Sequence, residues 1–288
     1  MEGGNVGSAE FTFIPGSLES MSTASLDLGT AGSITLVLQA VVPSVALSKT
    51  SMDLELTGGT DVPWSPTSDY INEVLRGCLR QLGISFTMEI ARRGYYPRGG
   101  GKARVHIEPC AEVEPLVLTS RRRDPNPPIS IVSRAGSLPG HVAERQAAAA
   151  ASWLARGGLR AKTTSVYAED SLSPGTSILI SLIGDSCFIG SDSIGAKGKP
   201  AERVGSEAAA GFVRTYDSPA CLDANLADMV APLLCMARRP SSFVTSQATS
   251  HLRTSLQVAA KFVDVDYSVA ALEDGGALVS IRPGQQNI

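Results

Sequence analysis

The order of predicted helices and strands near the start of the chain recurs near its end, and this recurrence most constrains the fold. The first stretch predicts a strand at 9–14, a buried helix at 34–47, a strand at 52–58, a helix at 68–82 and a hairpin of 84–92 with 102–107. The hairpin follows from alternation, because charged or polar side chains alternate with apolar ones along 102–107.

The last part of the chain repeats this order of elements. It predicts a helix at 222–237, a strand at 241–246, a helix at 251–262 and a closing hairpin of 265–272 with 277–281. The recurrence lies in the pattern of elements and not in identical residues. It therefore indicates two similar structural units.

Between the two units lies a stretch of different character, residues 122–216. It predicts a strand at 129–134, an alanine-rich helix at 141–155, strands around 164–168, 176–184 and 186–190, and a helix at 200–216. Pro200 suits the first turn of that last helix. We therefore expect an α/β (α+β) fold, in which a large domain of 1–121 and 217–288 carries a small α/β domain inserted at 122–216.

Composition indicates a globular protein without an overall attraction to nucleic acid. Hydrophobic residues make up 43% of the chain and charged residues 18%, and the net charge is -3. A nucleic-acid substrate would need a local basic patch, for which Arg92, Arg93, Arg98 and the run 121–123 are candidates. Such runs are also typical of a solvated surface.

The same sequence lacks the signals of membrane insertion and export. No apolar run reaches the ~18 residues of a membrane span, and the first residues lack the basic and apolar regions of a signal peptide. The five cysteines are widely spaced with no CxxC pair, which argues against a disulfide framework or a cysteine-rich zinc site. We expect an intracellular protein without membrane contact, nuclear in a eukaryote and otherwise cytoplasmic.

Histidine is scarce, so each of the three can be considered as a catalytic residue. His106 falls on the polar face of a predicted strand, and His141 begins a predicted helix, where a structural role suffices. His251 also begins a helix, whose free N–H groups and dipole favour an anion. From position alone, a structural role for His251 is the commoner case.

Three glycine-rich stretches could bind phosphate or form tight turns. They lie at 29–33, 58–61 and 99–101. None is a Walker motif or a GxGxxG motif, so the turn interpretation is favoured without excluding the other. Protease, zinc-site and hydrolase functions lack support, because HExxH, paired CxxC, GxSxG and paired-carboxylate motifs do not occur.

Six segments nevertheless follow one another as in a known family. They are 29–43 (GTAGSITLVLQAVVP), 58–71 (GGTDVPWSPTSDYI), 92–101 (RRGYYPRGGG), 141–145 (HVAER), 226–237 (LADMVAPLLCMA) and 249–254 (TSHLRT). Together they resemble the RNA 3′-terminal phosphate cyclases. The resemblance implies repeated βαβαββ units with a small inserted domain. It also implies use of ATP and a divalent cation (Mg or Mn) to convert an RNA 3′-phosphate into a 2′,3′-cyclic phosphate through a histidine–AMP intermediate.

The resemblance also implies the site residues. His251 matches the nucleophile, and a neutral imidazole is competent near pH 7. The positions expected around the ATP are Gln39, Pro66, Tyr70, Asn225, Asp228 and Met229. Tyr70 could flank the adenine, and Asp228 could assist the metal or the histidine. No dedicated metal ligand is expected, because phosphates commonly hold magnesium.

Some departures from the family pattern bear on activity. Met229 stands where the family usually has glutamine, and Asn225 stands where a tyrosine is common. The family's opening βα unit has no match, so the chain could be truncated or a shortened relative. The resemblance leaves the oligomeric state open.

Two other functions compete with the cyclase activity. A non-catalytic cyclase-like protein that binds RNA in ribosome assembly would lack the nucleophile, whereas this chain has His251. The unmatched opening unit favours that alternative. The enolpyruvyl transferases share the repeated units, but nothing here resembles their substrate-binding motifs.

Overall fold

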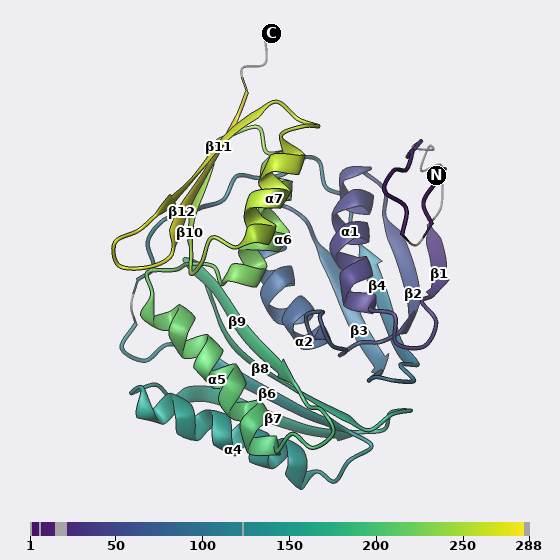
Figure 1. Ribbon diagram of the computed structural model, residues 1–288, viewed down its shortest axis with the longest axis vertical. Coiled ribbons are helices and arrows are strands. Elements are labelled where there is room, and N and C mark those ends of the chain that lie inside the picture. The colour runs from purple at the N-terminus through teal and green to yellow at the C-terminus, as the bar shows by residue number, and fades with distance from the viewer. Residues whose placement is uncertain (1, 6, 15–21, 123, 285–288) are drawn as a thin grey trace.

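Three four-stranded sheets and the helices packed against them make up the protein (Figure 1). The structure is a computed structural model that describes residues 2–5, 7–14, 22–122 and 124–284. The predicted mixed α/β class is confirmed. Within the described residues, no helix is both long enough and apolar enough to cross a membrane.

The first unit has the element order β-α-β-α-β-β. Its elements are β1 (Thr23–Asp27), α1 (Ile34–Leu47), β2 (Met52–Gly58), α2 (Ser68–Tyr70), the π-helical turn η1 (Ile71–Leu75), α3 (Arg76–Gln81), β3 (Phe86–Arg92) and β4 (Gly101–Ile107). The strand order is β1-β2-β4-β3, with β1 parallel to β2 and the other pairs antiparallel. The predicted helix at 68–82 corresponds to α2, η1 and α3 in succession.

The second unit repeats this topology with chain segments that are far apart in sequence. It consists of β5 (Val117–Leu118), α6 (Ala224–Leu234), β10 (Ser241–Thr245), α7 (Ser250–Ala259), β11 (Val265–Ala271) and β12 (Ala277–Pro283). β5 and β10 are parallel, and the β10–β12 and β11–β12 pairs are antiparallel. The sheet order β5-β10-β12-β11 therefore matches β1-β2-β4-β3.

The segment that forms the third sheet lies between β5 and α6 in the sequence. Its elements are β6 (Ile129–Gly136), α4 (His141–Arg156), β7 (Ala161–Glu169), β8 (Gly175–Gly184), β9 (Cys187–Ile194) and α5 (Ala201–Asp217). The strand order is β7-β6-β8-β9, and α4 and α5 lie together on one face (Figure 1). The division into domains at 121/122 and 216/217 stays a prediction.

One strand prediction in the first part of the chain is wrong, and one strand there was not predicted. Residues 9–14 form no strand, and only Thr12 makes an isolated bridge, with Glu2. Their alternating apolar side chains stay exposed, with Phe13 67% accessible, so alternation alone did not produce pairing. The first strand is instead β1, whose TASLD sequence carries a weak signal because four of its five residues are exposed.

The three glycine-rich stretches pack against one another through their backbones. Gly59 N–H donates to the Gly32 carbonyl (2.7 Å), and Ile34 N–H donates to the Gly59 carbonyl (2.9 Å). Gly100 N–H donates to the carbonyl of Thr30 (3.3 Å). These N–H groups are therefore engaged in turns that hold α1, β2 and the β3–β4 hairpin together.

Gly99 makes the closest of these backbone contacts. Its φ is +60°, and a Cβ there would lie 1.5 Å from the Thr30 carbonyl oxygen. We expect Gly99→Ala to lower the free energy of unfolding by about 3 kcal/mol or more, because left-handed backbone strain and a backbone clash add together. Urea denaturation measures the loss. Gly184→Ala is the control, since no atom lies within 4 Å of its added Cβ, and an equal loss there would contradict the argument.

Candidate active site

A cavity of about 460 Å³ lies where the two units face each other. This volume is within the range of small-molecule sites, roughly 300–1,000 Å³. Its walls come from α1, the β2–α2 loop, β9, α6 and α7, and comprise Leu36, Gln39, Trp64, Ser65, Pro66, Asp192, Asn225, Asp228, Met229, His251 and Ser255. The cavity thus brings together six of the seven predicted site residues from distant parts of the chain.

His251 lies in the first turn of α7, with its side chain exposed to the cavity. Thr249 caps this helix, because its hydroxyl oxygen accepts the N–H of Leu252 at 2.9 Å. The remaining N–H groups of the first turn and the helix dipole create a positive potential beside the imidazole. The position therefore suits a group that reacts with a phosphate.

The side chain of Asp228, on α6, contacts the residue that caps the start of α7. The Thr249 hydroxyl donates to its Oδ1 at 2.6 Å. Partial burial raises the pKa of Asp228, while the hydrogen bond from Thr249 and the charge of nearby His251 act in the opposite direction. Asp228 consequently holds the helix cap that orients His251 and also places a carboxylate in the cavity wall.

Gln39 provides a polar group that the described protein atoms leave unsatisfied. Its Nε2 is buried and has no hydrogen-bond partner among the described residues. An unpaired buried donor is costly, so a ligand acceptor at this wall of the cavity would remove the penalty. Gln39 therefore fits a bound polar ligand such as a nucleotide.

Tyr70 is the predicted site residue that does not line the cavity. Its side chain is 1% exposed, and its hydroxyl donates to Asp223 Oδ1 at 2.7 Å. Gly190 packs on the ring, where a Cβ would lie 2.7 Å away. The expectation that Tyr70 flanks an adenine is therefore not supported, because its ring is held in the core by this hydrogen bond.

Five cavity residues were absent from the prediction made from the sequence, namely Leu36, Trp64, Ser65, Asp192 and Ser255, and two of them bear most on ligand binding. Trp64 projects from the β2–α2 loop and is 98% exposed. Asp192, on β9, accepts the N–H of Thr67 at 2.8 Å through Oδ2, and burial raises its pKa. A tryptophan in a glycine- and proline-rich loop was a signal in the sequence, whereas Asp192 belongs to the inserted stretch and carried none.

Residues 1–269 match the family described as RNA 3′-terminal phosphate cyclase. The chain belongs to this family. A protein of Pyrococcus abyssi named RNA 3′-terminal phosphate cyclase is 40% identical over 263 residues, which cover 91% of this chain and 75% of the relative. Proteins of the same name from Pyrobaculum aerophilum (38% over 269 residues, 93% and 76% covered) and Archaeoglobus fulgidus (39% over 263 residues, 91% and 77% covered) are also similar.

The candidate RNA-contacting arginines of this cyclase family member differ in how far their side chains are free to meet RNA. Arg93 is 4% exposed and pairs with Asp61 (3.1 Å) and Asp69 (2.8 Å), so it cannot meet an RNA backbone. Arg121 is engaged as well, because it donates to the Tyr216 carbonyl and lies over that residue's ring. Arg98 is exposed.

The other candidates differ in what the structure says of them. Arg92 is partly exposed, with its Nε donating to the Gly100 carbonyl at 2.8 Å. Arg122 is exposed, whereas Arg123 lies outside the described residues. The exposed Arg98 and Arg122 therefore stay candidates for contact with RNA.

The cavity walls offer few protein ligands for a cation. Across the part of the chain that the structure describes, no group of three or more His, Cys, Asp or Glu side chains could hold a metal ion. Asp192 and Asp228 are the carboxylates of the cavity wall. This donor set fits a cation whose remaining ligands are the phosphates of a substrate.

The buried carboxylate of Asp223 links elements that form the cavity wall. It accepts hydrogen bonds from the Tyr70 hydroxyl (2.7 Å), Gly190 N–H (2.8 Å) and Leu226 N–H (3.0 Å), which connects α2, β9 and α6. Burial raises its pKa from 3.8 to about 6, although these hydrogen bonds act against the shift.

This raised pKa predicts a measurable dependence of stability on pH. Between about pH 4 and pH 6 the folded protein keeps the Asp223 proton and the unfolded chain loses it, so raising the pH favours unfolding. We expect the free energy of unfolding of the wild type to fall relative to Asp223→Asn across this window, by up to about 3 kcal/mol. Urea denaturation at a series of pH values measures the difference. Parallel profiles would contradict the prediction.

Proposed function

We propose that this protein converts the 3′-phosphate end of RNA into a 2′,3′-cyclic phosphate at the expense of ATP, with His251 as the nucleophile. The observation that carries this proposal is the position of His251 at the capped start of α7, inside the cavity lined by Gln39, Pro66, Asn225, Asp228 and Met229. The family assignment supplies the reaction type.

The first step forms a bond between His251 and AMP. A neutral imidazole nitrogen attacks the α-phosphorus of ATP, the bond from that phosphorus to the bridging oxygen breaks, and pyrophosphate leaves with the electron pair. Negative charge on the transferring group is stabilised by the N–H groups and dipole at the start of α7. Asp228, through Thr249, keeps this helix start in place.

The second and third steps return His251 to its free form and close the ring. An oxygen of the RNA 3′-phosphate attacks the α-phosphorus, and the phosphorus–nitrogen bond breaks. The vicinal 2′-hydroxyl then attacks the RNA phosphorus, loses its proton to a base, and AMP leaves with the electron pair. The overall reaction consumes one ATP and yields AMP and pyrophosphate for each cyclised end.

The walls suggest how ATP is held before the reaction. Gln39 supplies the unsatisfied amide, Pro66 and Met229 supply apolar surface, and Asn225 supplies a second amide. A divalent cation would be held by the phosphates together with Asp192 and Asp228, and would shield the negative charge that repels an incoming RNA phosphate. Because Asn225 and Met229 depart from the family pattern, we expect the affinity for ATP to differ from that of typical members.

An RNA substrate fits an intracellular enzyme, nuclear in a eukaryote and otherwise cytoplasmic. The five cysteines agree with a reducing compartment, because all of them are buried and unbridged. The contact with RNA is expected to be through phosphate and stacking and not through base-reading groups, so sequence specificity should be low.

The proposed reaction is tested with a 5′-labelled RNA oligonucleotide that ends in a 3′-phosphate. Incubation with ATP and magnesium is expected to make the end resistant to phosphatase, with one AMP and one pyrophosphate released per end. The same RNA with a 3′-hydroxyl is the control and should consume no ATP. A folded protein that binds the RNA but neither protects its end nor consumes ATP would instead be a non-catalytic RNA-binding relative.

A further inference from the structure

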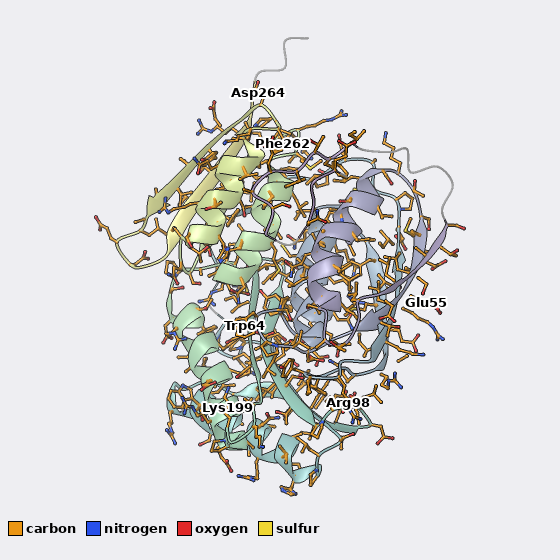
Figure 2. All side chains as sticks on the ribbon, turned by 45° about the vertical axis from the view of Figure 1, so that its right-hand side comes forward. Glu55, Trp64, Arg98, Lys199, Phe262 and Asp264 are labelled. Carbon is orange, nitrogen blue, oxygen red and sulfur yellow. The ribbon has the colours of Figure 1, made fainter. Side chains whose placement is uncertain are left out.

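Trp64 combines three features that structural stability does not explain. Its side chain is 98% exposed, so it buries almost no apolar surface in the fold. Its φ is +61°, a left-handed conformation that is a genuine outlier for a bulky residue. It also lines the cavity that contains His251, and Figure 2 shows its position between α1 and the α6–α7 pair. A strained and exposed aromatic beside a nucleophile indicates contact with a ligand.

The order of the proposed reaction decides which ligand this is, and the inference rests on that proposed function. When RNA arrives, AMP is already attached to His251 and occupies the interior walls formed by residues such as Gln39 and Met229. The RNA 3′-phosphate must therefore approach from the solvent side. A side chain that projects almost wholly into solvent meets the molecule that enters and not the one already enclosed.

We propose that Trp64 is the platform on which the base of the 3′-terminal RNA nucleotide stacks while its 3′-phosphate reaches His251. Single-stranded RNA is commonly bound by stacking of splayed bases on aromatic side chains. Leu36 of α1 lines the same cavity, is 49% exposed, and extends the apolar surface. Stacking accepts every base, so the platform would hold RNA ends of any sequence and place their phosphate at the reactive histidine.

Intrinsic fluorescence isolates this contact, because the chain has only two tryptophans. In a Trp153→Phe background, Trp64 is the sole indole, and titration with a 3′-phosphate oligonucleotide without ATP should quench its emission. Trp64→Ala should raise the Kd for that RNA about tenfold, a typical effect of losing one stacked base, and Trp64→Phe should change it by less than about threefold. Tyr96→Ala is the matched control, since Tyr96 is 66% exposed but lies outside the cavity.

A modified RNA makes the test specific for the terminal base. The modified oligonucleotide keeps its 2′-hydroxyl and 3′-phosphate but lacks the terminal base. Its Kd for the protein with Trp64 should equal the Kd of the complete RNA for the Trp64→Ala variant. The Kd of the modified oligonucleotide should be the same for the Trp64→Ala variant, because the stacking interaction is already absent. Additive losses, or quenching by ATP with none by RNA, would overturn the proposal.

The failure of this inference can be told apart from failure of the proposed function. A protein that takes up AMP from ATP, but whose RNA affinity is the same with tryptophan and with alanine at position 64, overturns the stacking role and leaves the reaction intact. A protein that shows the RNA-induced quench and the tenfold loss without AMP uptake upholds the platform and overturns the cyclisation.

Discussion

Replacing His251 with alanine is expected to abolish the transfer of AMP from ATP to the protein, with a loss of at least about 1,000-fold. In the proposed reaction the imidazole nitrogen forms the bond to the α-phosphorus, so its removal should leave AMP without an acceptor. The measurement uses ATP labelled at the α-phosphate with magnesium, a denaturing gel, and acid treatment of the labelled band. Label on the wild type should be lost in acid, because a phosphorus–nitrogen bond is acid-labile.

Two controls separate the loss of a nucleophile from the loss of the fold. His251 is exposed, so the alanine variant should keep its free energy of unfolding within about 0.5 kcal/mol of the wild type. His106→Ala is the matched histidine variant, because this residue lies on β4 and pairs with Asp53 at 2.7 Å, away from the cavity. Retention of label in the His251 variant would show that another residue carries the AMP.

The periodic elements of the fold could be predicted from the sequence, and the weakly patterned ones could not. The run 34–47 and the hairpin residues 102–107 became α1 and β4, because their side chains face one continuous core. β5 has two residues, too few for any period to appear. Residues 9–14 alternate without forming a strand, since pairing needs a neighbouring edge that local alternation cannot supply.

The candidate site was predictable only where a residue type and a motif coincide. His251 and Gln39 came from the family resemblance, and the structure places both in one cavity. Tyr70 came from the same resemblance, yet its ring lies in the core because Asp223, 153 residues further along, accepts the hydrogen bond of its hydroxyl. Contacts over such separations are set by packing, so neither the burial of Tyr70 nor the presence of Asp192 at the cavity could be read from local sequence.

Arg93 shows the same limit for charge, because its place in an arginine-rich motif suggested contact with RNA. In the structure it ties the first unit to the third sheet. Its guanidinium pairs with Asp61 and Asp69, while Arg134 of β6 bonds to the other oxygen of Asp69 at 2.7 Å and also to Glu169 of β7. Burial would raise the pKa of Asp69, but the two arginines hold it below its ordinary value. Removing one of these buried charges would therefore leave another without its counter-charge.

Replacing Arg93 with methionine is expected to lower the free energy of unfolding by about 3–5 kcal/mol, the usual cost of removing one partner from a buried ion pair. Methionine keeps most of the apolar stem, so the loss reports the missing charge and not a cavity. Asp61 is affected most, because its side chain is fully buried and, among the described residues, only Thr60 and Ser68 would still donate hydrogen bonds to it. Urea denaturation of both proteins at neutral pH measures the deficit.

The dependence of this deficit on pH identifies its cause. A buried carboxylate without its arginine takes up a proton more readily, which relieves the variant as the pH falls. The wild type keeps its ion pairs down to about pH 4, because the pKa of Asp69 lies below its ordinary value. The deficit should therefore shrink between neutral pH and about pH 4. Arg104→Ala is the control, because its pair with Glu55 (3.4 Å) is exposed and is worth less than about 1 kcal/mol. A deficit that stays constant with pH would show that Arg93 acts through packing, and that its charge does not hold the two parts together.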